Sequence, residues 1–432
     1  MYPAFNTLRL KLEGAERLLF LHLLPVPSDI TMVEMRYYEI KKSGVEQMNM
    51  LHTQNNQYRG NTAIQLAPLS PVNDPWDPIG SLSRYGGHRL TSVEMTVTNL
   101  CNMRCEHCAV GDTLVMAEPD KIPIGEMIRR LEEVEHLETI SITGGEPTFS
   151  NRTVKEYMVP LLQYARSRGV RSQINSNVTL PYSRYEQLAP FLDVMHISFN
   201  YTSAEDFHQI GFAKAGHSVS LEAAAKLYDR MIDNAQRLSD AGVLVSAESM
   251  INYRTHDKID EIHQLIVDMG CQRHEVHPMY PSSFAKDLPV ITREQMRRSI
   301  ELLLNSRDSN VWMLFGTLPF YQCSDNKQER DLLTRLANER NVTVRNDPDG
   351  RNRLNVNLFS GDVFVTDFSD VPSFGNIADS RLDELFDRWL KHPLAQGVNC
   401  HCPAASCCGP NLLVKDMYYK DVNFHMRSAI LE

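Results

Sequence analysis

Three cysteines lie close together in the run Asn99–Cys108, at Cys101, Cys105 and Cys108. The spacing, C-x3-C-x2-C, lets one short loop direct three thiolates toward a common centre. A cubane iron–sulfur cluster has four irons, so this loop would leave one iron open to a substrate or cofactor. A structural zinc site completed by His107 and a chance group of buried thiols are the alternatives.

A second motif, Gly144-Gly145-Glu146-Pro147, follows about forty residues later. Two glycines allow the backbone to approach a ligand closely and expose its amide groups. Glu146 can accept hydrogen bonds from an ammonium group. Alone, this run is typical of a structural turn. Beside a three-cysteine loop on a neighbouring strand, it favours a binding site.

Both motifs end predicted strands, because strands and helices alternate from about residue 92. The strands are predicted at 93–98, 139–143, 171–176, 194–199, 244–250 and 275–277, and the helices at 124–137, 154–166, 221–235 and 258–269. Six such units indicate a parallel sheet that is covered by helices on its outer face and curls into an open barrel. The carboxyl ends of its strands would build the active site.

After about 293 the alternation is expected to stop. A helix at 293–304, a hairpin of 354–359 with 363–368, and a helix at 381–390 are predicted instead. The fold class is therefore α/β: a partial (β/α)6 barrel over 71–292, with a C-terminal α+β cysteine-rich auxiliary domain over 293–432. The proline-rich stretch Pro71–Pro78 is expected to be a rigid linker, and residues 1–70 form an extension without an assigned role.

A second cysteine group lies near the C-terminus, at Cys400, Cys402, Cys407 and Cys408. Residues two apart in an extended chain point the same way, so the first two thiols can reach one metal. Cys323 and Cys408 are the candidates for a fourth ligand. This auxiliary site fits either an iron–sulfur cluster or zinc. Cys271 stands apart and is expected to be a buried thiol.

Composition narrows the class of protein. The chain has 432 residues, 44 Lys plus Arg, 54 Asp plus Glu and a net charge of −10, which argues against a nucleic-acid partner. The apolar stretch Leu18–Leu24 is too short to cross a bilayer and lacks the flanks of a secretory signal, so no membrane partner is expected. The chain has nine cysteines, and seven of them lie in two tight groups, which favours metal sites over disulfides. A cytoplasmic protein is predicted.

Together, Cys101, Cys105, Cys108 and Gly144–Pro147 resemble the radical S-adenosylmethionine superfamily over about residues 90–290. The resemblance implies that the three cysteines hold a [4Fe–4S] cluster and that S-adenosylmethionine chelates its fourth iron. It implies that the glycine turn contacts the methionine moiety, with Glu146 at the ammonium. The backbone of His107, at a position that is usually aromatic, would touch the adenine.

By analogy with that superfamily, polar residues at the other strand ends are candidates to hold ribose, adenine and carboxylate. These residues are Asn175, Asn177, Ser198, Asn200, Glu248 and Asn252. Three residues after strand six are candidates to face the substrate, namely His274, His277 and Tyr280. The sequence identifies no catalytic residue among them.

The tail, with Cys400, Cys402 and Cys407, is similar to radical S-adenosylmethionine proteins that carry a C-terminal CxCxxxxC motif, the YfkAB-like family. The run Asp74–Pro78 upstream of the barrel supports this resemblance. The hairpin and the stretch Phe374–Ile377 resemble auxiliary-cluster domains of peptide-modifying members. Those domains usually carry a cysteine five residues after the hairpin glycine, where this chain has Thr366.

The resemblance implies an enzyme that reductively cleaves S-adenosylmethionine to a 5′-deoxyadenosyl radical, which abstracts hydrogen from an unidentified substrate. A peptide or protein is the first candidate substrate. A small-molecule or cofactor-biosynthesis enzyme and a non-catalytic zinc scaffold are the alternatives. The implied partner is a low-potential electron donor of the flavodoxin or ferredoxin type, and the exposed iron implies oxygen sensitivity.

Overall fold

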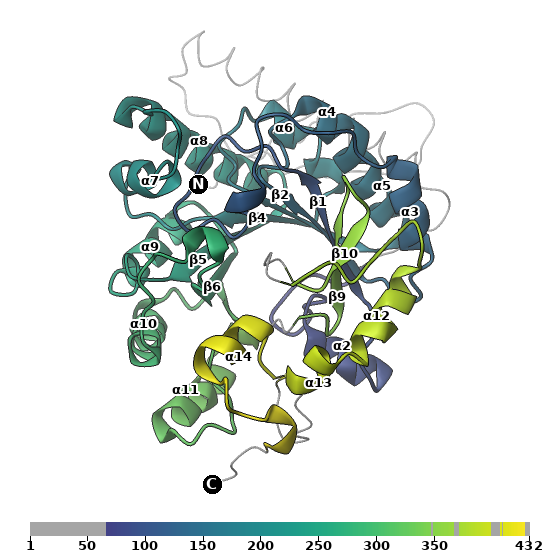
Figure 1. Ribbon diagram of the computed structural model, residues 1–432. Coiled ribbons are helices and arrows are strands. Elements are labelled where there is room, and N and C mark those ends of the chain that lie inside the picture. The colour runs from purple at the N-terminus through teal and green to yellow at the C-terminus, as the bar shows by residue number, and fades with distance from the viewer. Residues whose placement is uncertain (1–65, 347–348, 367–370, 399–406, 408, 428–432) are drawn as a thin grey trace, which may run out of the picture. The chain divides into compact units, whose positions relative to one another are not determined.

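The computed structural model describes residues 66–346, 349–366, 371–398, 407 and 409–427. They belong to one compact unit that begins at Gln65. A curved sheet lies at its centre, with strand order β11-β10-β9-β1-β2-β3-β4-β5-β6-β7-β8. Figure 1 shows these strands in an arc, with helices along the outer side. The predicted α/β fold with a parallel barrel core is confirmed.

Neighbouring strands from β1 to β8 pair in parallel, and β9 pairs in parallel on the other side of β1. The hairpin strands β9 and β10 are antiparallel, as are β10 and β11. The strands are β1 Ser92–Thr98, β2 Thr139–Gly144, β3 Arg171–Ser176, β4 Val194–Ser198, β5 Leu244–Ile251, β6 Arg273–Pro278, β7 Trp312–Gly316, β8 Val342–Arg345, β9 Arg353–Asn357, β10 Asp362–Phe364 and β11 Gly375–Asn376.

The helices lie between the strands and along the C-terminal part. They are α2 Pro78–Tyr85, α3 Ile124–Glu132, α4 Asn151–Thr153, α5 Val159–Arg168, α6 Ser183–Glu186, α7 Ala204–Gly211, α8 Leu221–Asp240, α9 Ile259–Asp268, α10 Arg293–Ser306, α11 Lys327–Asn338, α12 Leu382–Leu390, α13 Pro393–Val398 and α14 Leu412–Tyr418. Short helical turns are η1 Gly111–Thr113, η2 Val154–Met158, η3 Ala189–Phe191, η4 Ser283–Ala285 and η5 Phe424–Met426. In the part of the chain described here, none of the helices combines the length and apolar character needed to cross a membrane.

Local sequence explains the helix boundaries. Ser220 begins α8 by accepting a hydrogen bond from the amide of Ala223, and Gly169 ends α5 with a φ of 70°. The long helix α8 buries one stripe at intervals of three and four residues, formed by Ala224, Tyr228, Met231, Ala235 and Leu238. Such stripes pack against the outer face of the sheet in one hydrophobic core.

The two faces of the barrel strands differ in chemistry. On β1, Val93, Met95 and Val97 are fully buried in the hydrophobic core, while Glu94 and Thr96 alternate with them on the other face. Because successive side chains point to opposite faces of a strand, the inner face of the barrel carries the polar set. The barrel interior therefore offers polar side chains to any ligand.

The expectation that alternation stops near 293 is wrong. After α10 the chain forms β7, then α11, then β8, which extend the parallel sheet beyond β6. These two strands have only five and four residues, too short for a clear periodic pattern. The division into separate domains at 292 stays a prediction.

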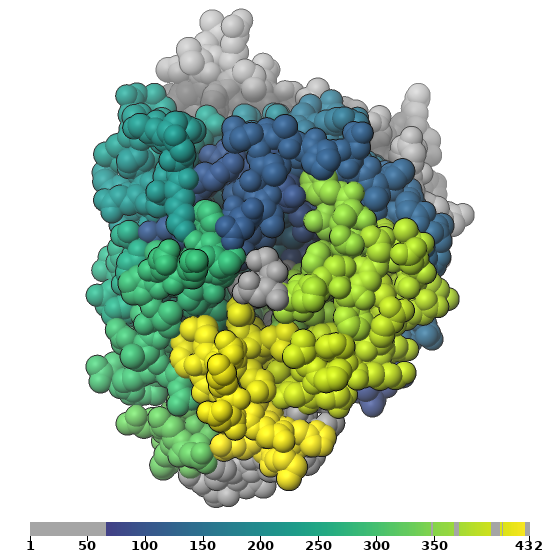
Figure 2. Space-filling model, viewed as in Figure 1, coloured from purple at the N-terminus to yellow at the C-terminus, as the bar shows by residue number. Residues whose placement is uncertain are grey.

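The predicted C-terminal hairpin is confirmed as β9 and β10, with Gly361 at a φ of 77° in the turn. Its first strand pairs with β1, so residues more than 250 positions apart share a register, with Ser92 opposite Arg353. Figure 2 shows the lime and yellow C-terminal residues along one side of the molecule, against both the blue and the green parts. The C-terminal residues therefore build part of the barrel.

The stretch Pro71–Pro78 is part of the barrel, and its prediction as a linker is wrong. Trp76 is buried, and its Nε1 donates a hydrogen bond to Ser141 Oγ on β2 at 3.2 Å. Asp74 Oδ2 lies 3.0 Å from Nη1 of Arg345 on β8. Asp77 caps α2 by accepting a hydrogen bond from the Ile79 amide at 2.9 Å. These contacts attach the segment to the inner face of the sheet.

Candidate active site

The three-cysteine loop begins directly after β1, as predicted. Cys101, Cys105 and Cys108 are each half-buried. The backbone amide of Arg104 donates to the carbonyl of Gly211 at 2.9 Å, and that of Glu106 donates to Ile210 at 3.1 Å. The end of α7 therefore fixes the backbone between the cysteines.

Burial controls the protonation of the three thiols. It raises the pKa of Cys101 to about 12, and it raises the pKa of Cys105 well above the ordinary value, with further contributions from the neighbouring Cys101 and Cys108. The pKa of Cys108 is also raised by burial, although Arg104 and Lys214 oppose the shift. Buried thiols of this kind become thiolates when a bound cationic metal centre offsets the cost of burying the negative charge.

The thiols of the three cysteines influence one another electrostatically, since Cys101 and Cys108 both contribute to the raised pKa of Cys105. Among the described residues, no group of three or more His, Cys, Asp or Glu side chains has the geometry of a site for a single metal ion. The metal centre that the cysteine loop holds stays a prediction.

His107 lies beside the last cysteine and is neutral. Burial lowers its pKa to about 4. Its Nδ1 atom is shielded from solvent and makes no hydrogen bond within the described residues. A buried ring nitrogen without a partner is a candidate contact for a bound molecule.

The glycine turn touches the start of the cysteine loop. The amide of Gly145 donates to the Thr98 carbonyl at 2.8 Å, and the amide of Glu146 donates to the Leu100 carbonyl at 2.7 Å. A Cβ atom on Gly144 would lie 2.1 Å from the Thr98 oxygen, and one on Gly145 would lie 2.4 Å from the Leu100 oxygen. Gly144 also has a φ of 144°. Only glycine fits at these two positions, so the two motifs form one unit.

Glu146 is fully buried, and its carboxylate already has donors. Its Oε1 accepts hydrogen bonds from the amide of Thr148 at 3.0 Å, from the hydroxyl of Thr148 at 2.6 Å and from Ser176 Oγ at 2.8 Å. Its Oε2 accepts one from the Asn177 amide at 2.8 Å. Burial nevertheless raises the pKa of Glu146. The carboxylate thereby joins the end of β2 to the end of β3.

The end of β3 also holds the cysteine loop. Asn177 Nδ2 donates to Asn102 Oδ1 at 3.0 Å, and Asn102 Nδ2 donates to Thr179 Oγ1 at 2.8 Å. Asn175 accepts a hydrogen bond from Gln173 at 2.9 Å. Asn177 is thus brought next to the cysteine loop, whereas Asn175 lies one step down the strand.

Three other predicted contacts at strand ends lie near β4 and β5. Ser198 is exposed at the end of β4. Asn200 Oδ1 accepts from the Met250 amide at 2.6 Å, and Asn252 Oδ1 accepts from the Arg254 amide at 2.8 Å. These two asparagines hold backbone amides, one within β5 and one in the loop after it, which is a structural role common at strand ends.

Three contacts that the sequence did not predict hold the cysteine loop from the side of β5 and β6. Glu106 is paired with Arg254, which follows β5, and it also accepts a hydrogen bond from the Tyr253 hydroxyl at 2.9 Å. Ser282 Oγ, after β6, donates to the Cys108 carbonyl at 3.2 Å. The sequence shows an acidic residue within the cysteine run, Glu106, but nothing in it indicates the partner.

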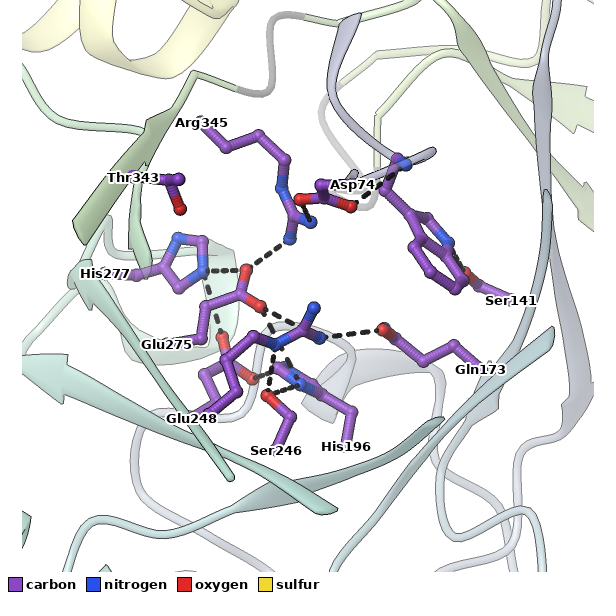
Figure 3. A network of polar contacts seen from close by, with 12 residues as sticks. Asp74, Ser141, Gln173, His196, Ser246, Glu248, Glu275, His277, Thr343 and Arg345 are labelled. Atoms are coloured by element: carbon purple, nitrogen blue, oxygen red, sulfur yellow. Dashed lines mark hydrogen bonds and ion pairs between the residues drawn. The ribbon is translucent and has the colours of Figure 1, made fainter. Parts of the chain in front are cut away.

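A polar network fills the interior of the barrel, as Figure 3 shows. Glu248 Oε2 on β5 lies 3.2 Å from His196 Nε2 on β4, and Glu275 Oε1 on β6 lies 2.9 Å from His277 Nε2. Burial opposes ionisation of Glu248, but the hydrogen bond from His196 and the charges of both histidines outweigh it and lower its pKa. Arg345 pairs with Glu275 from β8. The network joins strands on opposite sides of the barrel.

Two substrate candidates after strand six lie elsewhere. His274 points to the outer face of β6, where its Nδ1 lies 2.9 Å from Nδ1 of His263 on α9, so its prediction as a substrate contact is wrong. The alternation of side chains along β6, with Glu275 and His277 inward, places His274 outward. Tyr280 is buried and donates its hydroxyl to the Thr317 carbonyl at 2.6 Å.

The second cysteine group is described only in part. Cys400, Cys402 and Cys408 lie outside the described residues. Cys323 and Tyr321 belong to one buried cluster, and Cys407 packs against it. Burial raises the pKa of Tyr321 well above its ordinary value, with smaller contributions from Tyr280, Tyr419 and these two thiols. A cavity of about 160 Å³ is lined by Tyr321 and Cys407, among other residues. Cys271 is buried, as predicted.

Comparison with known proteins gives the family. Residues 95–266 match the Radical SAM superfamily, and residues 279–429 match the YfkB-like domain. A Bacillus subtilis protein designated YfkA is 53% identical over 366 residues, which are 84% of this chain and 98% of that protein. The chain belongs to the YfkAB-like family of radical S-adenosylmethionine proteins.

Solved structures share the fold of this radical S-adenosylmethionine protein. Streptococcus suis SuiB bound to S-adenosylmethionine has a TM-score of 0.51 at 14% identity, over 77% of this chain and 76% of SuiB. SuiB bound to precursor peptide SuiA has a TM-score of 0.52 at 14% identity, over 87% and 85%. A probable GTP 3′,8-cyclase of Saccharolobus islandicus is 21% identical over 207 residues, 46% of this chain and 60% of that protein.

The chain is therefore a radical S-adenosylmethionine enzyme, and the alternative of a non-catalytic zinc scaffold is wrong. Membership of this superfamily implies S-adenosylmethionine and a [4Fe–4S] cluster as cofactors.

Proposed function

We propose that Cys101, Cys105 and Cys108 hold a [4Fe–4S] cluster, and that the enzyme forms a 5′-deoxyadenosyl radical that removes a hydrogen atom from a peptide. When bound, the cluster and S-adenosylmethionine supply the one-electron chemistry. The observation that carries this proposal is the contact between the two motifs. The glycine turn touches the start of the cysteine loop through two hydrogen bonds of 2.8 and 2.7 Å.

The chain's own residues would bind and orient S-adenosylmethionine beside that loop. Gly144, Gly145 and Pro147 present backbone to the methionine moiety. His107 offers the adenine its shielded Nδ1, which has no hydrogen-bond partner within the described residues. Asn177 adjoins the cysteine loop, while Asn175, Ser198 and Glu248 are proposed contacts further round the strand ends.

Glu146 is proposed to act mainly by fixing the turn. Three of its four donors bind Oε1, and one binds Oε2. An ionised carboxylate has about four lone-pair positions over two oxygens, so Oε2 retains capacity for the ligand's ammonium. Its rigid position is what this role requires.

A peptide substrate is supported by the shared fold with SuiB, which has been solved with its precursor peptide SuiA. The inward polar face of the barrel also suits a substrate with polar side chains. A small-molecule substrate is the second candidate, supported by the relative designated a probable GTP 3′,8-cyclase.

We further propose an auxiliary iron–sulfur cluster, or zinc, on Cys323, Cys400, Cys402, Cys407 and Cys408. The packing of Cys323 and Cys407 in one cluster around Tyr321 supports a common centre. A flavodoxin or ferredoxin would supply the low-potential electron, and the reducing, oxygen-poor chemistry suits a cytoplasmic location.

The test is S-adenosylmethionine cleavage by anaerobically reconstituted protein with dithionite, measured as 5′-deoxyadenosine. We expect the wild type and the Cys271→Ala control to form 5′-deoxyadenosine and Cys105→Ala to form none. Synthetic peptides and GTP are then added separately, and stimulation by one of them identifies the substrate class. A wild type that is full of iron and sulfide but forms no 5′-deoxyadenosine would contradict the proposal.

A further inference from the structure

His277 and Glu275 form a histidine–carboxylate pair on the inner face of β6. Nε2 of His277 lies 2.9 Å from Oε1 of Glu275. Among the described residues, Nδ1 of His277 makes no hydrogen bond, and the side chain is 20% exposed. When a carboxylate binds one ring nitrogen, it fixes the ring orientation and leaves the other nitrogen to act. Nδ1 is therefore the reactive position.

Positive charges hold Glu275 ionised. Arg345 pairs with Oε1, and Arg273 Nη2 lies 3.6 Å from Oε2. Burial opposes ionisation of Glu275, but Arg345, His196 and His277 outweigh it and hold the pKa of Glu275 well below its usual range. Glu275 thus takes no proton near neutral pH and serves to stabilise a protonated imidazole beside it.

The neighbouring strand leaves room for this imidazole. Gly316, the last residue of β7, lies against the ring, and a Cβ atom there would be 1.9 Å from His277 Cε1. Any other residue would displace the ring from its carboxylate. Glycine at this position is explained by the close approach of the histidine.

A second histidine pair shows what a purely structural arrangement looks like here. His263 Nδ1 lies 2.9 Å from His274 Nδ1, and His263 Nε2 accepts a hydrogen bond from the Asp308 amide at 3.0 Å. Both nitrogens of His263 are used, outside the barrel. His277 differs because it lies on the inner face of β6 and only its Nε2 makes a hydrogen bond within the described residues.

The pair also lies at the right edge of the sheet. His277 is near the carboxyl end of β6, and the cysteine loop and glycine turn follow the carboxyl ends of β1 and β2. In parallel barrels this edge holds the active site. Glu248 lies between, with Oε1 3.9 Å from His277 Nε2.

We propose that His277 is a catalytic base, which takes the proton from a hydroxyl, thiol or amine on the substrate carbon that loses its hydrogen atom. Glu275 is its positioning residue. The proposal rests on the proposed function and names its substrate class: peptides whose reacting side chain carries O–H, S–H or N–H.

The step balances. One hydrogen atom leaves the substrate carbon for the 5′-deoxyadenosyl radical, so the odd electron stays on that carbon. The heteroatom–hydrogen bond breaks with both electrons left on the heteroatom, and the proton moves to Nδ1 of His277. No electron leaves the substrate in this step, and the new negative charge is stabilised beside the imidazolium.

The test uses N-acetylated, C-amidated Gly-Xaa-Gly peptides with the reconstituted enzyme. We expect Xaa = Ser, Thr or Cys to stimulate 5′-deoxyadenosine formation, and Ala or Val not to do so. His277→Gln is expected to lower the peptide-stimulated rate about a hundredfold, which is typical for loss of a general base. His217→Gln, an exposed histidine, is the matched control and should leave stimulation unchanged.

A pH profile separates a catalytic from a structural role. The stimulated rate should rise as His277 loses its proton. Glu275→Gln should move that midpoint to lower pH, because it removes the carboxylate that raises the pKa of His277. Glu248 and Arg345 remain as the other charges that face the ring.

An unchanged midpoint in Glu275→Gln, full stimulation in His277→Gln, or equal stimulation by the Ala peptide would overturn the proposal. So would the absence of stimulation by every peptide while peptide-free 5′-deoxyadenosine still forms. If no 5′-deoxyadenosine forms at all, the proposed function fails, and the role of His277 fails with it.

Discussion

Arg254 donates two hydrogen bonds to the carboxylate of Glu106, from Nε to Oε1 at 2.6 Å and from Nη2 to Oε2 at 3.1 Å. Glu106 lies between Cys105 and His107, whereas Arg254 follows β5 on the other side of the barrel. The loop after one strand therefore fixes the shape of the cysteine loop after another. Bidentate pairs of this kind combine energy with geometric precision.

Removing the Arg254–Glu106 pair should make the cysteine loop less stable. Arg254→Ala leaves the buried Glu106 with only the Tyr253 hydroxyl, so we expect a loss of about 1–3 kcal/mol in the free energy of unfolding. We also expect less iron per chain after desalting. Urea unfolding and iron analysis measure the two effects. Arg152→Ala removes an exposed surface pair and is the control, expected to change neither. Equal unfolding free energies and equal iron contents in the two variants would contradict a role of the Arg254–Glu106 pair in holding the loop.

The glycine turn should not tolerate a side chain. Gly145→Ala would place a Cβ 2.4 Å from the Leu100 carbonyl oxygen and push the turn away from the cysteine loop. We expect weaker binding of S-adenosylmethionine, measured by equilibrium dialysis under nitrogen. Gly125→Ala in α3 is the control, because nothing lies within 4 Å of its Cβ position. Alanine in a helix should stabilise by about 0.5–1 kcal/mol. Normal affinity in Gly145→Ala would refute the close-approach argument.

Stability should depend on pH through His277. Burial lowers the pKa of His277, but the hydrogen bond and charge of Glu275, with Glu248, raise it above 6.5. A histidine whose pKa is higher in the folded state than in the unfolded state stabilises the folded protein. This contribution is fully present at pH values below the unfolded-state pKa, and it is lost as the pH rises through the folded-state pKa. The stability difference between wild type and His277→Gln should therefore be larger at about pH 6 than at about pH 9. Denaturant unfolding at both pH values measures this stability difference. A difference that grows as the pH rises would contradict the pairing of His277 with Glu275.

The fit of His277 against β7 can be tested separately. Gly316→Ala should displace the imidazole from Glu275, since the added Cβ would lie 1.9 Å from Cε1. Without that hydrogen bond, the pKa of His277 should fall. Titration of the 13C-labelled imidazole by NMR measures the change. A pKa that stays at the wild-type value would show that the ring has not moved.

The auxiliary centre predicts a specific metal count. Cys323→Ser should lower the content of the second centre, whereas Cys271→Ser, a buried thiol elsewhere, should not. Iron, sulfide and zinc per chain distinguish the two metals proposed. Identical counts in wild type and Cys323→Ser would exclude Cys323 as a ligand.

The parts that sequence alone predicted are local in the chain. Cys101, Cys105 and Cys108 lie within one loop, and Gly144–Pro147 within one turn, so their spacing is visible directly. Strands such as β1 and β5 were predicted because they are long and apolar on one face. Hydrophobic periodicity reads such segments well.

The parts that it missed depend on long-range pairing. The partnership of Arg254 with Glu106, and that of β9 with β1, joins segments far apart in sequence, and nothing local marks them. The exclusion of His274 as a substrate contact was within reach, because Arg273, Glu275 and His277 lie on one strand face and His274 lies on the other. Parallel strands are usually apolar on both faces, whereas β6 is polar on its inner face, so the usual sequence pattern does not identify it.

We propose that the cysteine loop holds a cluster with an iron open to S-adenosylmethionine. Electron paramagnetic resonance of the dithionite-reduced protein, recorded with and without S-adenosylmethionine, tests it most directly. We expect a [4Fe–4S]⁺ signal that changes shape when S-adenosylmethionine binds and that is absent in Cys105→Ala. A signal that is identical with and without S-adenosylmethionine, in protein with full iron content, would contradict it.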